Sequence, residues 1–196
     1  MLKTAVIGFI LALAITAYSQ EREYKTLVDF DQARISGKGG PFMQFTAIDG
    51  EFAHLLGGGG AIMVDDFFFG GYGIGLTNRI QADRPEYRVG DNLSVGHGGF
   101  WLGYSLFGER PVHVAISTLI GWGEIGIKGD NFSNIGYPDN IFVVTPTLEV
   151  ELNLTHFFRM GVGATYNLFT FVDLPGYTAG DFSAPGGFIS FQFGWF

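Results

Sequence analysis

The sequence predicts an all-β protein, an eight-stranded antiparallel up-and-down transmembrane β-barrel. Apolar and polar residues alternate with a period of two through residues 142–168, which is typical of strands with one apolar face. The predicted strands reach about a dozen residues, and a tilted strand of about 9–11 residues crosses a bilayer. No apolar run of about 20 residues follows the N-terminal segment, so a chain that spans a membrane must close into a barrel.

The first 19 residues have the features of a secretory signal peptide. Lys3 supplies a basic start, Ala5–Ala14 is an uninterrupted apolar core, and small residues at Ala17 and Ser19 suit a cleavage site. A buried N-terminal helix is the alternative, and the core is too short for a spanning helix. The chain has no cysteine, which excludes a lipoprotein anchor, a disulfide framework and a thiolate metal site. We expect an exported mature chain that starts at Gln20.

The net charge bears on the class of partner. The chain carries a formal charge of −8, and removal of Lys3 with the signal peptide changes this charge to −9. Nucleic acids and anionic membrane surfaces attract basic proteins and repel acidic ones. We therefore expect no nucleic-acid partner.

The mature chain is predicted to be one domain preceded by an extension. Residues 20–40 begin with charged residues, lack a clean period and end in Ser36–Gly40, whose composition is typical of a flexible hinge. We expect residues 20–40 to lie outside the membrane, on the side of the C-terminus. Residues 41–196 are then expected to form the barrel.

Eight segments carry the strand pattern. The weakest contains Gly57–Gly60, and there we expect the missing side chains to leave room for a large neighbour such as Trp101. Glu124 falls on the apolar face of its strand, which predicts either a bulge or the edge of the bilayer. The predicted strands are residues 41–48, 51–64, 67–77, 94–106, 111–126, 142–153, 157–168 and 186–196.

The connections differ in length between the two ends of the predicted barrel. Asp49-Gly50 is a two-residue hairpin turn in which both residues need a positive φ. An even number of strands places both termini at one end, together with the short turns at 65–66, 108–110 and 154–156. The long loops at 78–93, 128–140 and 172–185 then share the other end. Short periplasmic turns and long outer loops are typical of transmembrane barrels.

These features resemble the small eight-stranded outer-membrane β-barrel proteins of Gram-negative bacteria. The resemblance implies location in the outer membrane and insertion by the barrel-assembly machinery, which reads an aromatic C-terminal strand. Phe191, Phe193, Trp195 and Phe196 match that assembly signal. Phe196 departs from the family pattern, because it falls on the face opposite to Phe193 and Trp195, one residue out of step.

Because side chains alternate between the two faces of a strand, the lumen is expected to contain Glu149, Glu151 and Arg159. We interpret these three residues as an interior ion-pair network. A three-residue turn at 154–156 would place Glu151 directly opposite Arg159. Breaking such a buried pair should cost on the order of 3–5 kcal/mol, and removing both partners should recover much of the loss. A catalytic pair of carboxylates is the alternative. We expect Trp101, Phe69, Leu119 and this network to block the lumen, since eight strands enclose only enough space for side chains.

The four histidines lie on separate segments, at His54, His97, His113 and His156, without the spacing of metal ligands. We expect no metal and no cofactor. His97 with Ser94, or His54 with Glu51, could serve a lipid-modifying enzyme, but no nucleophile motif accompanies either pair.

The predicted outer loops are rich in aromatic residues. These candidate surface-loop contacts are Tyr87, Phe132, Tyr137, Tyr177 and Phe182. One interpretation is that the loops pack on each other over the barrel mouth. The other is a docking surface for another protein or for lipopolysaccharide, since exposed aromatic residues are enriched at interfaces.

Together these observations predict a non-enzymatic structural or accessory subunit of the outer membrane. It would present its loops at the cell surface and its N-terminal segment in the periplasm. The expected partners are outer-membrane lipid, the barrel-assembly machinery during insertion and another outer-membrane protein. The alternatives are a narrow channel and a lipid-modifying enzyme.

Overall fold

Long antiparallel strands dominate residues 33–129 and 138–196, which are the residues that the computed structural model describes. The predicted signal peptide, the start at Gln20 and residues 20–32 of the extension lie outside these ranges. One short helix, α2 (Ala179–Phe182), occurs in the described ranges. The strands are β1 (Ile35–Ile48), β2 (Glu51–Val64), β3 (Phe67–Leu76), β4 (Asn92–Leu106), β5 (Val112–Lys128), β6 (Asp139–Asn153), β7 (Phe158–Tyr166), β8 (Leu168–Thr170) and β9 (Pro185–Trp195).

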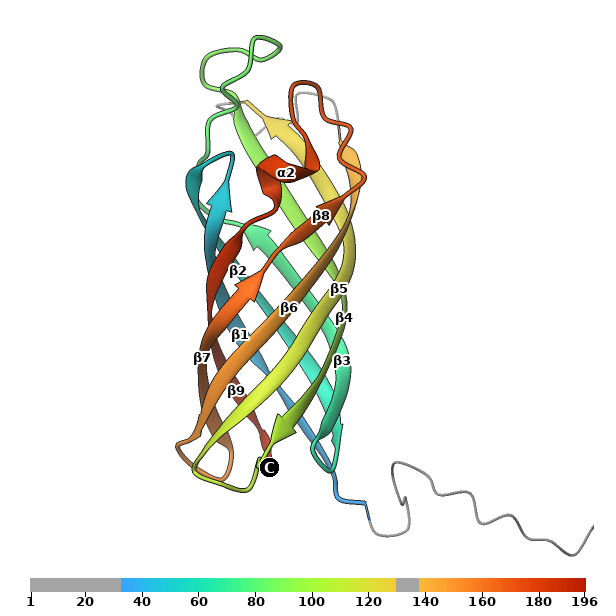
Figure 1. The fold of residues 1–196 in the computed structure, drawn as a ribbon, viewed down its shortest axis with the longest axis vertical. Coiled ribbons are helices and arrows are strands. Elements are labelled where there is room, and N and C mark those ends of the chain that lie inside the picture. Colours follow the sequence, from blue (N-terminus) through green and yellow to red (C-terminus); the bar gives the residue numbers. More distant parts are fainter. Residues whose placement is uncertain (1–32, 130–137) are drawn as a thin grey trace, which may run out of the picture. The chain divides into compact units, whose positions relative to one another are not determined.

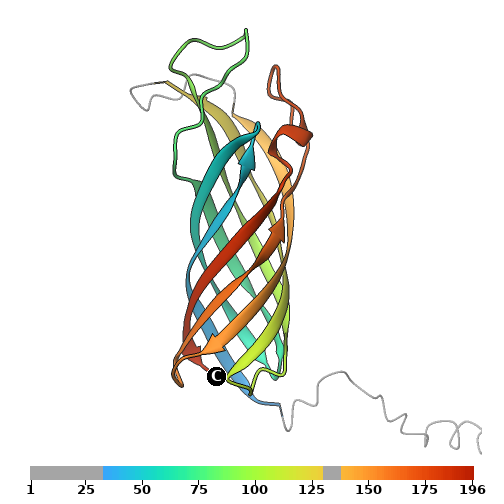
Figure 2. The ribbon, with the colours of Figure 1, turned by 60° about the vertical axis from the view of Figure 1, so that its left-hand side comes forward.

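The strands form a closed ring. From β1 to β7 each strand pairs with the next in antiparallel fashion, and β9 closes the ring by pairing with β7 and β1. β7 and β8 count as one strand of the ring, because both pair with β6, on either side of Asn167. The described strands therefore make the eight-stranded up-and-down barrel that the sequence predicts, and Figures 1 and 2 show it from two sides.

Alternate residues on each strand face the lumen and the outside. On β6, Glu149 and Glu151 are 2% and 0% exposed, whereas Leu148 and Val150 are 54% and 46% exposed. This apolar-out, polar-in alternation is that of a barrel wall in lipid. Large exposed apolar residues recur around the wall, among them Ile62, Phe69, Phe100, Ile116, Trp122, Leu148, Val150, Val162, Leu168 and Phe193.

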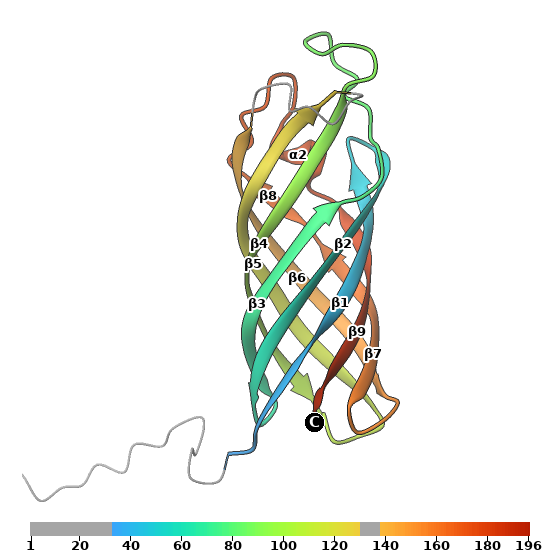
Figure 3. The ribbon, with the colours of Figure 1, turned by 180° about the vertical axis from the view of Figure 1, so that it is seen from behind.

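The two ends of the barrel differ as predicted. The short connections 65–66, 107–111 and 154–157 lie at the end where β1 begins and β9 finishes (Figure 3). Because short turns are typical of the periplasmic side, we call this the periplasmic end and the other the extracellular end. Asp49 and Gly50 form the one tight turn at the extracellular end in the described ranges, with φ of 52° and 77°.

The predicted start of the barrel at residue 41 is wrong, since β1 begins at Ile35. Gly39 and Gly40 do not form a hinge but pair with Gly60 and Gly59 of β2. A side chain at Gly40 would collide with the backbone of Phe191 on β9. The glycines therefore allow close packing of neighbouring strands, which composition alone could not distinguish from flexibility.

The predicted register of the β6–β7 hairpin is also wrong, by two residues. Arg159 lies opposite Asn153, and Glu151 lies opposite Gly161. The turn is longer than three residues, because the backbone amides of Leu154 and Thr155 both donate to the Phe158 carbonyl at 3.1 Å. A shift of two residues keeps every side chain on its predicted face.

Two smaller predictions also need correction. Phe69 does not block the lumen, because it is 48% exposed on the outer wall, whereas Trp101 and Leu119 are buried inside. No bulge occurs at Glu124, which pairs in regular register with Gly96 and Asn140. Glu124 instead follows Trp122 on the outer wall, as expected at the edge of a bilayer.

Candidate functional site

The periplasmic half of the lumen holds a buried polar network that draws on five strands. Glu151 is its centre, because His113 Nε2, Lys38 Nζ and Arg159 Nη1 lie 2.8, 3.5 and 3.8 Å from its carboxylate oxygens. Gln192 also donates a hydrogen bond to Glu151, at 2.9 Å. The sequence pattern of the β6–β7 hairpin could not predict the contacts of Glu151 with Lys38 and His113, since these residues lie on β1 and β5.

Glu149 is the second carboxylate of this network. Its Oε1 accepts a hydrogen bond from Ser190 Oγ on β9. Gly161, which lies opposite Glu151 on β7, leaves room for this carboxylate, because a Cβ at Gly161 would collide with Glu149 Oε1. Two carboxylates face one lysine and one arginine, so each buried charge has a counterion close by.

An aromatic layer closes the lumen above the network. Phe42, Phe68, Trp101 and Phe188 are each at most 2% exposed, with ring centroids 5.2–6.1 Å apart in the contacting pairs. Lys38 Nζ lies 3.6 Å from the centroid of the Phe68 ring, so the ammonium group contacts the underside of the layer. The predicted room beside Gly57–Gly60 is present, because a Cβ at Gly59 would lie 3.2 Å from Trp101.

Phe196 covers the periplasmic side of the network. Its ring centroid lies 3.6 Å from Arg159 Cζ, a cation–π contact. Trp195 is 82% exposed on the outer wall. The structure thus places the last two residues of the predicted assembly signal on opposite sides of the wall, as the alternation of side chains along a strand predicts.

Polar side chains above the aromatic layer are paired with each other. Asn167 Oδ1 accepts hydrogen bonds from Gln44 Nε2 at 2.7 Å and from Thr145 Oγ1 at 3.0 Å. Tyr72 OH lies 2.9 Å from His97 Nδ1. These contacts lie between the aromatic layer and the apolar residues below the extracellular mouth.

The extracellular mouth is closed by two loops, residues 77–91 and 171–184, which we call the extracellular cap. Arg84 connects the cap to the barrel, because its Nη2 lies 2.5 Å from Asp49 Oδ1 and its Nε donates to the Gly176 carbonyl at 2.9 Å. Tyr87 donates to the Pro175 carbonyl at 2.7 Å and stacks on Tyr177 with a centroid distance of 6.0 Å.

The ionisable groups of the cap reflect this packing. Burial raises the pKa of Tyr177 to about 12, and the guanidinium of Arg84 lies 4.6 Å from its ring centroid. Hydrogen bonds from the hydroxyl and the backbone amide of Thr178 lower the pKa of Asp181. The hydrogen bond to Asp49 raises the pKa of Arg84. The pairing of Arg84 with Asp49 therefore favours the charged form of the guanidinium.

The predicted surface-loop contacts are only partly available. Tyr177 and Phe182 are 6% and 0% exposed, so the prediction that they form a docking surface is wrong. Packed against the apolar mouth, these side chains avoid the cost of exposure to water. Tyr87 is partly buried beside them, and Phe132 and Tyr137 lie outside the described residues.

The histidines do not assemble into a site. His97 is buried in the lumen whereas Ser94 lies on the outer wall, so the two cannot act as a pair. His54 lies 2.6 Å from Thr77 Oγ1. The described ranges contain no group of three or more His, Asp and Glu side chains that could hold a metal ion.

Comparison with known proteins adds a likeness of fold. No family model matches the chain, and no curated protein matches it. The crystal structure of Neisserial surface protein A (NspA) matches with a TM-score of 0.55 and 10% identity, over 83% of this chain and 97% of that one. Ail, the attachment invasion locus protein of Yersinia pestis, matches in its complex with the heparin analogue sucrose octasulfate. That match has a TM-score of 0.49 and 10% identity, over 83% and 99% of the two chains.

The closed ring, the apolar outer wall and the likeness to NspA define a class. The chain has the fold of the small eight-stranded β-barrel proteins of the outer membrane. Its outer wall is apolar, and its own buried side chains line the lumen.

Proposed function

We propose that the protein is a non-enzymatic accessory subunit of the outer membrane that presents its extracellular cap to a partner protein. The observation that carries this proposal is the contrast between the lumen and the cap. Buried side chains line the lumen from the network to the mouth, whereas the cap is a surface fixed by contacts between distant segments.

The cap is suited to recognition because its backbone is held in place before a partner arrives. Arg84 joins residues that are 35 and 92 positions away in the sequence. A preorganised surface loses less conformational entropy on binding. Val89 and Phe171, in the two cap loops, are 104% and 77% exposed and offer apolar contacts.

The alternatives receive less support. A narrow channel would have to pass both the aromatic layer and the network around Glu151. A lipid-modifying enzyme would need a nucleophile beside a base, and Ser94 and His97 lie on opposite sides of the wall.

Co-purification from the native membrane in mild detergent tests the proposal. We expect a stoichiometric protein partner with the wild type, and its loss from the Val89→Asp and Phe171→Asp variants. Leu154→Asp is the matched control, since Leu154 is 55% exposed at the periplasmic end. Retention of the partner by both cap variants, or no partner with the wild type, would refute a role for the cap.

A further inference from the structure

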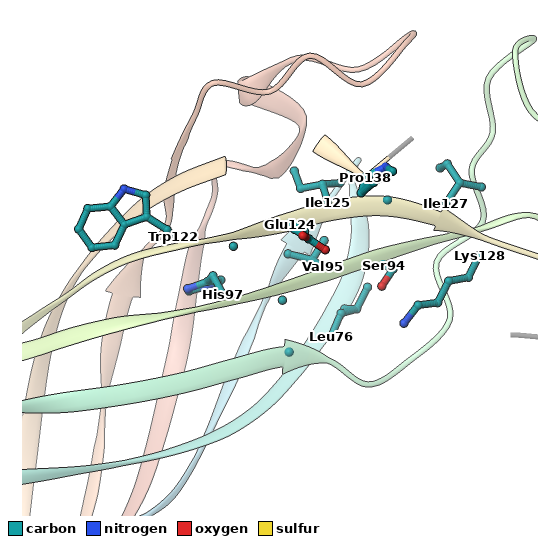
Figure 4. A pocket seen from close by; sticks show the side chains of 14 residues that line it. Leu76, Ser94, Val95, His97, Trp122, Glu124, Ile125, Ile127, Lys128 and Pro138 are labelled. Carbon is teal, nitrogen blue, oxygen red and sulfur yellow. The ribbon is translucent and has the colours of Figure 1, made fainter. Parts of the chain in front are cut away.

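A groove on the outer wall plays no part in the proposed function. It has a volume of about 730 Å³ and crosses β3, β4 and β5 near their extracellular ends. Figure 4 shows Trp122 at one end of the groove and Lys128 at the other, with Glu124 between them. A smaller hollow of about 110 Å³ continues beyond Lys128 and is bordered by Arg79 and Asn92.

The groove exists because outward positions on three adjacent strands have small side chains. Gly75 pairs with Gly96, which in turn pairs with Glu124. Two residues further toward the extracellular end, Ser94 pairs with Gly126. The floor is therefore strand backbone. Trp122, which is 56% exposed, stands above this floor as a wall.

The glycines of the floor are not required by the packing of the barrel. A Cβ at Gly75 or Gly96 would meet only a backbone oxygen, at 3.6 or 3.9 Å, which is ordinary contact distance. At the lumen glycine Gly161, by contrast, a Cβ would collide with Glu149. The barrel could hold larger residues at Gly75 and Gly96, so the space above them remains available to an occupant.

The chemistry of the groove changes along its length. Its lower end combines bare backbone with Trp122, and tryptophan is typical of the boundary between acyl chains and headgroups. Its upper end carries Lys128, whose side chain extends toward Ser94 in Figure 4, and the adjoining hollow carries Arg79. Lys128 is a cation at this end of the groove, in a chain of net charge −8, and it is complementary to an anionic headgroup.

We propose that this groove binds one phosphate-bearing, acylated glycolipid of the outer leaflet. An acyl chain lies beside Trp122, a sugar ring lies over Gly75 and Gly96, and a phosphate group contacts Lys128. Glu124 accepts hydrogen bonds from sugar hydroxyl groups, which distinguishes a glycolipid from a headgroup that carries phosphate alone. This site is on the wall and is independent of the partner-binding role of the cap.

Native mass spectrometry of the full-length mature protein in detergent, titrated with bisphosphorylated lipid A, tests the site. We expect Lys128→Ala and Gly96→Leu each to raise the dissociation constant by about tenfold or more. Lys128→Ala removes a charge-assisted contact, and Gly96→Leu fills the floor of the groove. Gly60→Leu is the matched control: it adds the same side chain to the outer wall of β2, outside the groove, where a Cβ meets only the Lys38 carbonyl oxygen at 3.7 Å. Binding to Gly60→Leu should stay within about twofold of the wild type.

Dephosphorylated lipid A and phosphatidylethanolamine complete the design. We expect both to bind at least about tenfold more weakly than bisphosphorylated lipid A. Equal affinity of Gly96→Leu and the wild type would overturn the groove as the site. Equal affinity for phosphatidylethanolamine would overturn the assignment to a glycolipid. Heat-modifiable migration of every variant on a gel establishes that each barrel has folded.

Discussion

At the scale of single residues, Glu151 determines the arrangement of the lumen network. The sequence suggested a pair of Glu151 with Arg159, yet Lys38 and His113 lie closer to the carboxylate than Arg159 does. Removing Arg159 therefore leaves Glu151 with three partners, Lys38, His113 and Gln192. Removing Glu151 leaves two buried cations, Lys38 and Arg159, without their shared counterion.

The two kinds of variant should differ in stability. Glu151→Leu should lower the free energy of unfolding by on the order of 3–5 kcal/mol, because it leaves buried charges uncompensated. Arg159→Met should cost less, and the double variant should recover little, since Lys38 stays unpaired. Urea unfolding in detergent, followed by tryptophan fluorescence, measures both. Glu109→Leu, at an exposed pair with Arg34, is the control and should cost at most about 1 kcal/mol.

Phe196 and Trp195 should have separable roles. Phe196→Ala should lower stability by about 1–2 kcal/mol, because it removes the ring that contacts Arg159. Trp195→Ala should instead reduce insertion by the assembly machinery, since Trp195 faces outward beside Phe193. Urea unfolding and the amount of folded barrel in the membrane fraction report the two effects. Slower insertion of Phe196→Ala at unchanged stability would reverse these assignments.

At the scale of elements, the cap is a unit made by contacts between loops rather than within them. The pKa of Tyr177 rises from 10 to about 12 because the folded cap buries the neutral phenol. A raised pKa in the folded state means that this contribution to stability is complete below pH 10. The contribution is lost as the pH rises from 10 toward 12, because the unfolded cap favours the tyrosinate.

Alkaline titration should test directly whether the cap buries Tyr177. The difference in ultraviolet absorbance between the wild type and Tyr177→Phe should show one tyrosine that ionises near pH 12. The charge of Arg84 by itself lowers the pKa of Tyr177, but burial is the larger effect, so Arg84→Met should lower that pKa toward 10 when the loops separate and expose the ring. The titration of Tyr177 at pH 10 in the wild type would show that the cap is open in solution.

At the scale of the whole molecule, we expect a closed barrel rather than a pore. The aromatic layer and the network around Glu151 occupy successive levels of the same lumen. The strands reach 17 residues in β5, well beyond the roughly 9–11 needed to cross a bilayer. We expect the extra length to extend beyond the membrane, where it surrounds apolar side chains beneath the cap.

Planar-bilayer recording should therefore show no stable nanosiemens-scale conductance. Trp101→Ala should remain non-conducting as well, because the network still closes the periplasmic half. It should nevertheless destabilise the barrel by about 3–5 kcal/mol, as expected for removal of a buried aromatic side chain. A steady open pore in the wild type would favour the channel alternative.

The folded barrel should also migrate differently from the boiled protein on a detergent gel. A closed ring leaves no free strand edge from which detergent could begin unfolding. Identical mobility, with full solubility in the absence of detergent, would contradict a transmembrane barrel.

The sequence by itself determined the features that depend on local pattern. A period of two assigned Glu149, Glu151 and Arg159 to the lumen and Leu148 and Val150 to the outer wall, because side chains alternate in any extended strand. The Asp49-Gly50 turn followed from backbone preference, since its two residues need a positive φ.

Only the tertiary structure decided what depends on contacts between distant segments. The register of Arg159 required the geometry of the turn, and the role of Gly40 required knowledge that β9 packs against it. Lys38 joined Glu151, and Arg84 joined Gly176, across more than 90 residues of sequence. Such pairs arise from ring closure and from loops that bury their aromatic residues against one apolar mouth, and neither leaves a periodic signal in the chain.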